Sequence, residues 1–199
     1  MKIVLIALIG YLTGSISFAV IIGYLAKGID IRKMGSGNAG ATNVKRILGF
    51  KLGATVMILD FLKGLLPILL INNFQLPINL ELVKIILLLS LILGHLYPIW
   101  FSFKGGKGVA TAAGGITAIF PPAFPFSIVV FILSRYIGKH VSLASLISAW
   151  ILPVFYYIFT NITKTDTSVI LLIFFIFIAI LITISHRKNI VRLYKGTEY

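Results

Sequence analysis

The sequence predicts an all-α, polytopic membrane protein with seven transmembrane helices. Of its 199 residues, 59% are hydrophobic and the mean hydropathy is +1.06, which is more apolar surface than a water-soluble fold of this length buries. Apolar runs of membrane-spanning length alternate with short basic loops, and a cluster of prolines divides one of these runs. No internal repeat interrupts this pattern, so we expect a single domain over residues 1–199.

The spans are expected where about 20 residues follow one another with little or no charge, because a helix needs that length to cross a bilayer. The first run is too long for the core of a signal peptide and has no clear cleavage site, so we expect it to be a retained first span. The runs comprise residues 3–26, 52–71, 85–103, 108–134, 141–163 and 167–185.

The fourth run contains Pro121, Pro122 and Pro125 near its middle. A continuous helix would lose part of its hydrogen-bond ladder there. We therefore expect two short helices, at about 108–120 and 123–135, joined by a proline-rich turn. This division raises the number of spans from six to seven.

Charge decides between six and seven crossings and sets the orientation. With seven crossings, most of the 18 basic residues fall on one face, whereas the loop over residues 72–81 has no lysine or arginine. The positive-inside rule then places the N-terminus outside and the C-terminus in the cytoplasm. Because these basic residues border the spans, the rule also explains the net charge of +13, and we expect no nucleic-acid partner.

The first polar insertion, GSGNAGATNVKR, spans residues 35–46 on the expected cytoplasmic face. Its glycines allow a tight backbone path, and the helix that follows would direct the positive end of its dipole at the loop. The groups offered to an anion belong to Gly35, Ser36, Gly37, Asn38, Gly40, Thr42, Asn43, Lys45 and Arg46. The insertion thus fits a phosphate-binding loop, although a turn followed by glycines that pack a helix is the commoner meaning of a lone glycine-rich segment.

The second insertion, KGGKGVAT, repeats this combination of lysine and glycine before a helix rich in small residues. Its candidate phosphate-binding residues are Lys104, Gly105, Gly106, Lys107 and Gly108. For the part over residues 110–115, we expect the small residues to pack one helix against another.

The third insertion, HRKNIVRL, continues the last span into the cytoplasm. Helical spacing places His186 and Asn189 on one face, where an imidazole and an amide can hold a hydroxyl group. The neighbouring cations, Arg187, Lys188 and Lys195, are interpreted as a basic surface for anionic lipid. Ser142 enters a span on the same face and is a further candidate donor to phosphate.

Three ionisable side chains fall inside or at the end of apolar runs. Asp60 and Lys63 lie three residues apart within the second span. Ionisable residues there indicate a functional site by default, although mutual neutralisation explains the pair equally well. His95, near the end of the third span, is interpreted as an interfacial or packed histidine.

Missing residue types exclude several chemistries. The chain has no cysteine and only five acidic residues, which are scattered. A thiol nucleophile is therefore excluded, and the carboxylates are too few to hold paired magnesium ions. We expect a metal-independent reaction and no cofactor. No histidine is followed by the acid that completes the HxxxxD pair of acyl-CoA-dependent glycerolipid acyltransferases.

In combination, these segments resemble the motifs of the acyl-phosphate-dependent glycerol-3-phosphate acyltransferases of bacterial membranes, the PlsY family. The resemblance covers essentially the whole chain and includes the VSLAS segment at residues 141–145 and the terminal KGTE. It implies catalytic roles for Ser36, Arg46, His186 and Asn189 and a structural role for Glu198. The substrate-binding residues it implies are Gly35, Gly37, Asn38, Gly40, Thr42, Asn43, Lys104, Gly105, Gly106, Lys107, Gly108 and Ser142.

The implied reaction transfers an acyl group from acyl phosphate to the 1-hydroxyl of sn-glycerol 3-phosphate, giving lysophosphatidic acid and inorganic phosphate in the first step of phospholipid synthesis. Its expected partners are the two substrates and membrane lipid, and its expected location is the bacterial inner membrane with the active site facing the cytoplasm. The proton is expected to pass to the acyl phosphate, with His186 as general base the alternative. A transporter or channel for a small organophosphate is the rival function, and nothing in the sequence indicates an oligomeric state.

Overall fold

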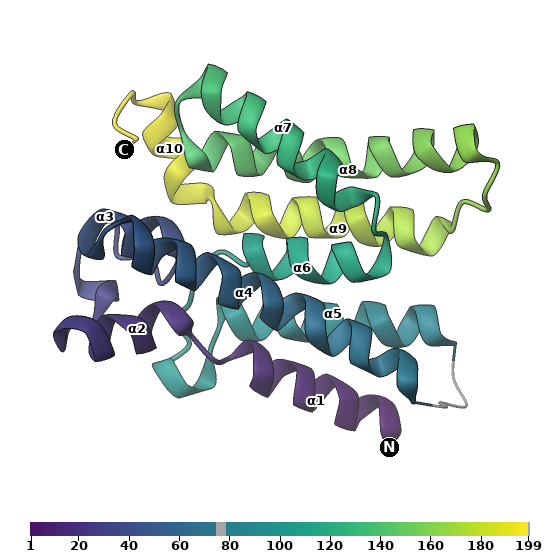
Figure 1. The fold of residues 1–199 in the computed structure, drawn as a ribbon, viewed down its shortest axis with the longest axis horizontal. Helices are drawn as coiled ribbons and strands as arrows, with labels where there is room; N and C mark the ends of the chain where they lie inside the picture. Colours follow the sequence, from purple (N-terminus) through teal and green to yellow (C-terminus); the bar gives the residue numbers. More distant parts are fainter. Residues whose placement is uncertain (75–78, 199) are drawn as a thin grey trace. The chain divides into compact units, whose positions relative to one another are not determined.

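The computed structural model describes residues 1–74 and 79–198, and over these ranges the chain is all helical (Figure 1). The α-helices are α1 (Lys2–Gly14), α2 (Phe18–Lys27), α3 (Ala41–Leu48), α4 (Phe50–Leu70), α5 (Leu80–Leu96), α6 (Val109–Ile119), α7 (Ala123–Gly138), α8 (Val141–Thr163), α9 (Val169–Ser185) and α10 (Arg187–Tyr194). Three 3₁₀ turns accompany them, η1 (Ile31–Lys33), η2 (Ile71–Asn73) and η3 (Ile99–Phe101). The predicted all-α class is confirmed, and part of the predicted loop over residues 72–81 lies outside the described residues.

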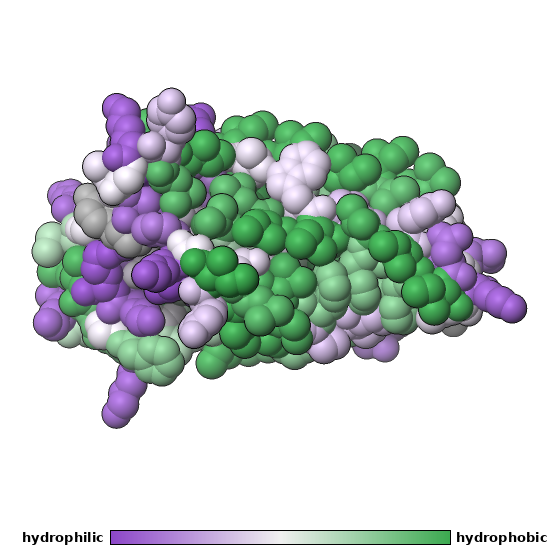
Figure 2. All heavy atoms as spheres, turned by 90° about the horizontal axis from the view of Figure 1, so that it is seen from above, coloured by the Kyte–Doolittle hydropathy of each residue, from purple (hydrophilic) through white to green (hydrophobic). Residues whose placement is uncertain are grey.

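Four segments of the described chain are long and apolar enough to cross a membrane: Lys2–Lys27, Phe50–Asn73, Leu80–Phe101 and Val141–Thr163. Helices α9 and α10 pass the same test together but bend by 63° between Ser185 and Arg187. The apolar helices α6 and α7 are shorter, with 11 and 16 residues. Hydrophobic residues (green) cover the middle of the face seen in Figure 2, and hydrophilic residues (purple) gather at its ends.

The chain forms two compact units, Met1–Phe120 and the described residues from Pro121 onward. In the first unit, α5 packs against α1 and α6 against α4 (Figure 1). Glycine brings these helices into backbone contact, because a Cβ on Gly14 would overlap the Leu91 backbone, and one on Gly114 would overlap the Phe61 backbone. Gly64 faces the Thr111 carbonyl in the same manner. The packing role predicted for residues 110–115 is thus confirmed.

The first span, expected over residues 3–26, corresponds to the candidate span Lys2–Lys27 and contains a break that the sequence analysis did not predict. Helix α1 ends at Gly14 and α2 begins at Phe18. The carbonyl of Ile16, freed from the helical ladder at this break, accepts a hydrogen bond of 2.8 Å from the Lys63 ammonium. A carbonyl left without a partner in a membrane is costly, so the break persists because α4 supplies the donor.

The proline-rich connection lies where it was predicted. Helix α6 ends at Ile119 and α7 begins at Ala123, with Pro121 and Pro122 between them. Pro125 occupies the first turn of α7, where its missing N–H breaks no helical hydrogen bond.

The second unit is held by aromatic contacts along α8. The rings of Phe126 and Phe155 stack at 3.7 Å between centroids, joining α7 to α8. Tyr156 packs edge-on against Phe175, and its hydroxyl accepts a hydrogen bond from the Ser168 N–H at 3.0 Å. Helix α8 therefore fixes both α7 and the start of α9.

Candidate active site

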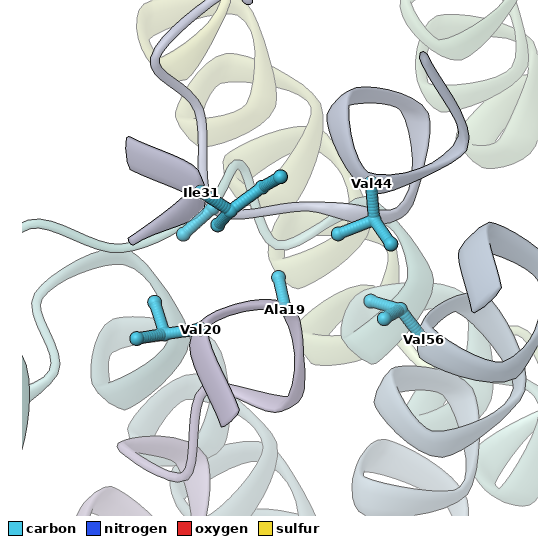
Figure 3. Close-up of a cluster of buried hydrophobic side chains, with 6 residues drawn as sticks. Ala19, Val20, Ile31, Val44 and Val56 are labelled. Carbon is cyan, nitrogen blue, oxygen red and sulfur yellow. The ribbon is translucent and has the colours of Figure 1, made fainter. Parts of the chain in front are cut away.

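The first glycine-rich loop rests on an apolar cluster in the first unit. Figure 3 shows members of this cluster of buried hydrophobic side chains, Ala19 and Val20 from α2, Ile31 from η1, Val44 from α3 and Val56 from α4. All five side chains are almost completely buried. The cluster fixes both ends of the loop, because Ile31 precedes the loop and Val44 lies in the helix that follows it.

Asn43 holds the loop from inside and is only 1% exposed. Its Oδ1 accepts a hydrogen bond from the Ser36 N–H at 2.9 Å, and its Nδ2 donates to the carbonyls of Ile31 and Met34, both at 3.0 Å. Asn43 is predicted to bind phosphate, but in the structure its amide makes these hydrogen bonds within the protein. Asn43 therefore holds the loop in shape through hydrogen bonds to its backbone.

Glycine is required at two positions of this loop by the backbone. Gly35 and Gly37 have φ values of 58° and 74°, in the left-handed region that disfavours a side chain. Gly40 is extended and forms the N-cap of α3, and its carbonyl accepts hydrogen bonds from the Asn43 and Val44 N–H groups. The first turn of α3 thus begins at the loop, as the sequence predicts.

Arg32 pairs with Asp30 before the loop and joins this segment to η3 by a hydrogen bond. Arg32 Nη2 lies 2.8 Å from Asp30 Oδ2, and Arg32 Nη1 donates to the Phe101 carbonyl at 2.6 Å. The hydrogen bond from Arg32 lowers the pKa of Asp30, and the same bond raises the pKa of Arg32. Arg32 therefore connects the segment before the first loop to the segment before the second.

The second glycine-rich loop lies on the C-terminal end of α5. The N–H groups of Gly105 and Gly106 donate to the carbonyls of Leu96 and His95, both at 3.1 Å. No side chain fits at either glycine: a Cβ on Gly105 would overlap the His95 carbonyl, and one on Gly106 would overlap the His95 ring. Gly108, with φ 78°, then begins α6.

The two loops meet at Gly106 and Ala39. A Cβ on Gly106 would also lie 2.6 Å from the Ala39 carbonyl oxygen, and Ala39 is itself buried. Among the candidate residues of these two insertions, Lys104, Arg46 and Thr42 are exposed, and Ser36, Asn38 and Lys107 are half-buried. The first unit therefore brings together the candidate residues of the first two insertions, with cations and hydroxyl groups near glycine backbone.

His186 lies where α9 bends into α10 in the second unit, and it is 2% exposed. Its Nδ1 lies 2.8 Å from the Ile182 carbonyl oxygen. Because a carbonyl only accepts hydrogen bonds, Nδ1 carries the proton, and in the neutral ring Nε2 carries the lone pair. The acceptor nitrogen of the neutral ring is therefore Nε2.

Glu198 links two other candidates of the second unit. Its Oε1 accepts hydrogen bonds from Ser142 Oγ, at 2.8 Å, and from Asn189 Nδ2. Ser142 begins α8 and Asn189 lies in α10, so the carboxylate fixes both helix ends. The structural role expected for Glu198 fits this geometry.

Three features of these sites were not predicted from the sequence. Ala39 was not singled out, although its carbonyl faces Gly106, and the backbone partner of His186 Nδ1 cannot be read from a side-chain pattern. His95 was expected to be a packed or interfacial histidine, and in the structure it also supports the second loop. Over residues 1–74 and 79–198, no group of three or more His, Asp or Glu side chains is arranged to hold a metal ion.

Comparison with known proteins places this chain among enzymes of lipid synthesis. A glycerol-3-phosphate acyltransferase of Fusobacterium nucleatum is 44% identical over 188 residues, which are 94% of this chain and 92% of that protein. The enzyme of the same name from Aquifex aeolicus is 42% identical over 200 residues, covering 100% of this chain and 99% of that protein.

Similar solved structures carry the same enzyme name as these relatives. The crystal structure of PlsY, an integral membrane glycerol 3-phosphate acyltransferase in its glycerol 3-phosphate form, has a TM-score of 0.88 and 40% identity, covering 100% of this chain and 95% of that chain. The family model for glycerol-3-phosphate acyltransferase matches residues 4–196. This chain therefore belongs to the glycerol-3-phosphate acyltransferase family.

Proposed function

We propose that this protein transfers an acyl group from acyl phosphate to the 1-hydroxyl of sn-glycerol 3-phosphate, producing lysophosphatidic acid and inorganic phosphate. The observation that carries the proposal is the junction of two glycine-rich, cation-flanked loops at Gly106 and Ala39. Both substrates contain phosphate, and each loop presents groups that bind it. The related crystal structures are of a glycerol 3-phosphate form and a lysophosphatidic acid form.

The proposed binding roles follow the two loops. Arg46 and Lys104, both exposed beside the junction, neutralise phosphate charge, and Ser36, Asn38 and Thr42 add hydroxyl and amide groups. Lys107 assists from the second loop. The N–H groups of Gly37, Gly40, Gly105 and Gly106 donate to carbonyls within the protein, so these glycines shape the loops. Asn43 keeps the first loop in shape through its three hydrogen bonds.

The proposed chemical step is a direct acyl transfer. The 1-hydroxyl oxygen attacks the acyl carbonyl carbon, the bond from that carbon to the phosphate oxygen breaks, and the hydroxyl proton passes to the departing phosphate. Phosphate is a good leaving group, so the protein mainly aligns the two substrates and stabilises the developing negative charge. No metal ion or cofactor enters this scheme.

His186 and Asn189 are proposed to orient glycerol 3-phosphate. The Ile182 carbonyl at 2.8 Å fixes the ring of His186 with Nε2 as acceptor, so Nε2 can receive a hydrogen bond from the substrate hydroxyl. The same geometry permits the alternative in which Nε2 takes the proton as general base. We favour positioning, because the partner of Nδ1 is a neutral carbonyl, whereas a carboxylate would stabilise an imidazolium ion.

The proposed topology has seven spans, with the N-terminus outside and the active site on the cytoplasmic face of the bacterial inner membrane. Helices α6 and α7 count as two short spans in this scheme, and the segment Lys2–Lys27 counts as one. The basic residues of the loops then lie predominantly on the cytoplasmic side, as the positive-inside rule requires.

Purified protein in detergent tests the proposal directly. Incubation with acyl phosphate and glycerol 3-phosphate should release inorganic phosphate and form lysophosphatidic acid, and replacement of the donor by acyl-CoA should abolish product formation. A protein that releases no phosphate in either reaction, but carries glycerol 3-phosphate across liposome membranes, would instead be a transporter.

A further inference from the structure

A buried polar cluster lies among α4, α5 and α6, beneath the second loop. It comprises Asp60 and Lys63 from α4, His95 from α5 and Thr111 from α6, all at least nine-tenths buried. Lys63 Nζ lies 3.0 Å from Asp60 Oδ1, 2.8 Å from the Ile16 carbonyl oxygen and 3.1 Å from His95 Nδ1. Thr111 Oγ1 lies 3.2 Å from the same histidine nitrogen.

The Lys63 ammonium has three buried polar neighbours. An ammonium group has three protons and no lone pair, and its three neighbours are a carbonyl, a carboxylate and an imidazole nitrogen. Neutralisation of the charge requires only Asp60. The additional contact with His95 links the ion pair on α4 to a residue that supports the second loop.

This contact fixes the state of the His95 ring. Because Lys63 only donates, His95 Nδ1 must accept, and the neutral ring therefore carries its proton on Nε2. Nε2 is the atom that a Cβ on Gly106 would overlap, and the Ala39 carbonyl faces the same point. The protonated edge of the ring is thus directed at the junction of the two loops.

We propose that Asp60 and Lys63 are positioning residues for acyl transfer, and that they act through His95. By holding the ring in one orientation and one tautomer, they fix how closely Gly106 approaches Ala39, and hence where Lys104 and Lys107 present their charges. The inference rests on the proposed phosphate-binding function of the two loops.

The double substitution Asp60→Leu/Lys63→Met tests this role without leaving an unpaired charge. Replacement of a buried ion pair by apolar residues of similar volume is often neutral or stabilising, but Lys63→Met also removes the donor to the Ile16 carbonyl. The melting temperature in detergent should therefore fall only by the cost of that one lost hydrogen bond, and kcat/KM is measured at a temperature where the variant is folded. Misplacement of the second loop should lower kcat/KM for acyl transfer by about 10²-fold. A folded variant with native kcat/KM would overturn the proposal, because the cluster would then serve only helix packing.

Two substitutions of His95 test the positioning role even if the Asp60→Leu/Lys63→Met variant does not fold. His95→Gln places its amide near the position of Nε2 and can still donate toward the loop junction. His95→Asn places its amide near Nδ1 and retains only the contact with Lys63. Partial activity in His95→Gln with much lower activity in His95→Asn supports positioning through Nε2, whereas equal activity in the two variants contradicts it.

A matched control is Ser90→Ala, which removes a buried polar group from α5 outside this cluster. Ser90 Oγ donates to the Ile86 carbonyl of its own helix at 2.8 Å, so its loss should leave kcat/KM unchanged. Native protein that releases no phosphate from acyl phosphate would contradict the proposed function itself. If the native protein is active and the Asp60, Lys63 and His95 variants are equally active, only the positioning role is wrong.

Discussion

Asn189 and Glu198 are joined by a hydrogen bond that closes the end of the chain onto α10, and Ser142 donates to the same carboxylate oxygen. A single acceptor thereby holds a predicted catalytic amide and the first turn of α8. The position of Asn189, which we propose to orient glycerol 3-phosphate, therefore depends on a residue at the end of the described chain.

Glu198→Ala should raise the KM for glycerol 3-phosphate and lower kcat, because it leaves two donors without their acceptor. The loss should reach about 10- to 100-fold in kcat/KM, corresponding to about 1–3 kcal/mol for unsatisfied buried groups. Glu198→Gln should be less severe, since its carbonyl oxygen can still accept both hydrogen bonds. Steady-state kinetics on both variants, with Thr197→Ala as control, measure the difference; equal losses in Ala and Gln would argue against an acceptor role.

Arg46→Ala and Lys104→Ala should each reduce turnover by about 10²-fold or more while the protein stays folded, because each removes a charge-assisted contact with phosphate. Lys188→Ala should have little effect, since that exposed cation belongs to the basic surface next to the membrane. Phosphate release and thermal unfolding should be measured on all three variants. If all three variants lose activity to the same extent, the positive charges of Arg46 and Lys104 serve to attract anionic lipid and not to bind phosphate.

His186→Asn and His186→Gln should retain measurable activity if the acyl phosphate accepts the proton. The remaining rate should then not titrate near pH 6.5, the ordinary pKa of histidine. His186→Ala should increase the KM for glycerol 3-phosphate as well as decrease kcat. Loss of rate by about 10²- to 10⁴-fold in every variant at unchanged KM, with recovery on addition of imidazole, would identify His186 as general base.

Asn43→Ala should destabilise the first loop, because three backbone groups lose a buried partner at a cost of about 1–3 kcal/mol for each unsatisfied group. Asn43→Asp should not rescue it, since a carboxylate cannot donate to the carbonyls of Ile31 and Met34. The melting temperature and the KM values for both substrates should therefore change together. Thr55→Ala, which removes an exposed hydroxyl bonded to its own helix, is the control. A change in KM with no change in melting temperature would indicate that Asn43 contacts phosphate directly.

The proposed topology can be tested by cysteine labelling, since the native chain has no cysteine. A cysteine at Asn73 should react with an impermeant thiol reagent added outside intact cells, and one at Lys33 should react only after the membrane is opened. Both positions are exposed in the structure. External labelling at Lys33 would invert the proposed orientation of the active site.

Some features of the fold follow from local sequence, and these were predicted. Pro121 and Pro122 are adjacent and interrupt the helical hydrogen-bond ladder twice, so the division between α6 and α7 could be inferred from the chain alone. Gly35 and Gly37 in a polar segment likewise indicated a tight loop. By contrast, Gly14 alone did not indicate the break at Ile16, because the break depends on a lysine that lies 47 residues further along the chain.

Most partners of the candidate residues could not be predicted either, because they lie far away in the sequence and meet only when the helices pack. The pairing of Asp60 with Lys63 is a spacing within one helix, and the sequence indicated it. The contact of Lys63 with His95 joins two helices and requires their packing to be known. Asn43 was assigned to phosphate because its amide suits an anion, whereas its burial commits that amide to the loop.

The hydrogen bond between Lys63 and Ile16 also has a consequence for biosynthesis. The first span emerges from the ribosome before α4 and must enter the lipid with the Ile16 carbonyl lacking its eventual partner. Helix α4 then arrives with a charged lysine that is costly to place in lipid. Association of the two segments removes both costs at once, so we expect the N-terminal spans to assemble in the membrane before the C-terminal unit has been synthesised.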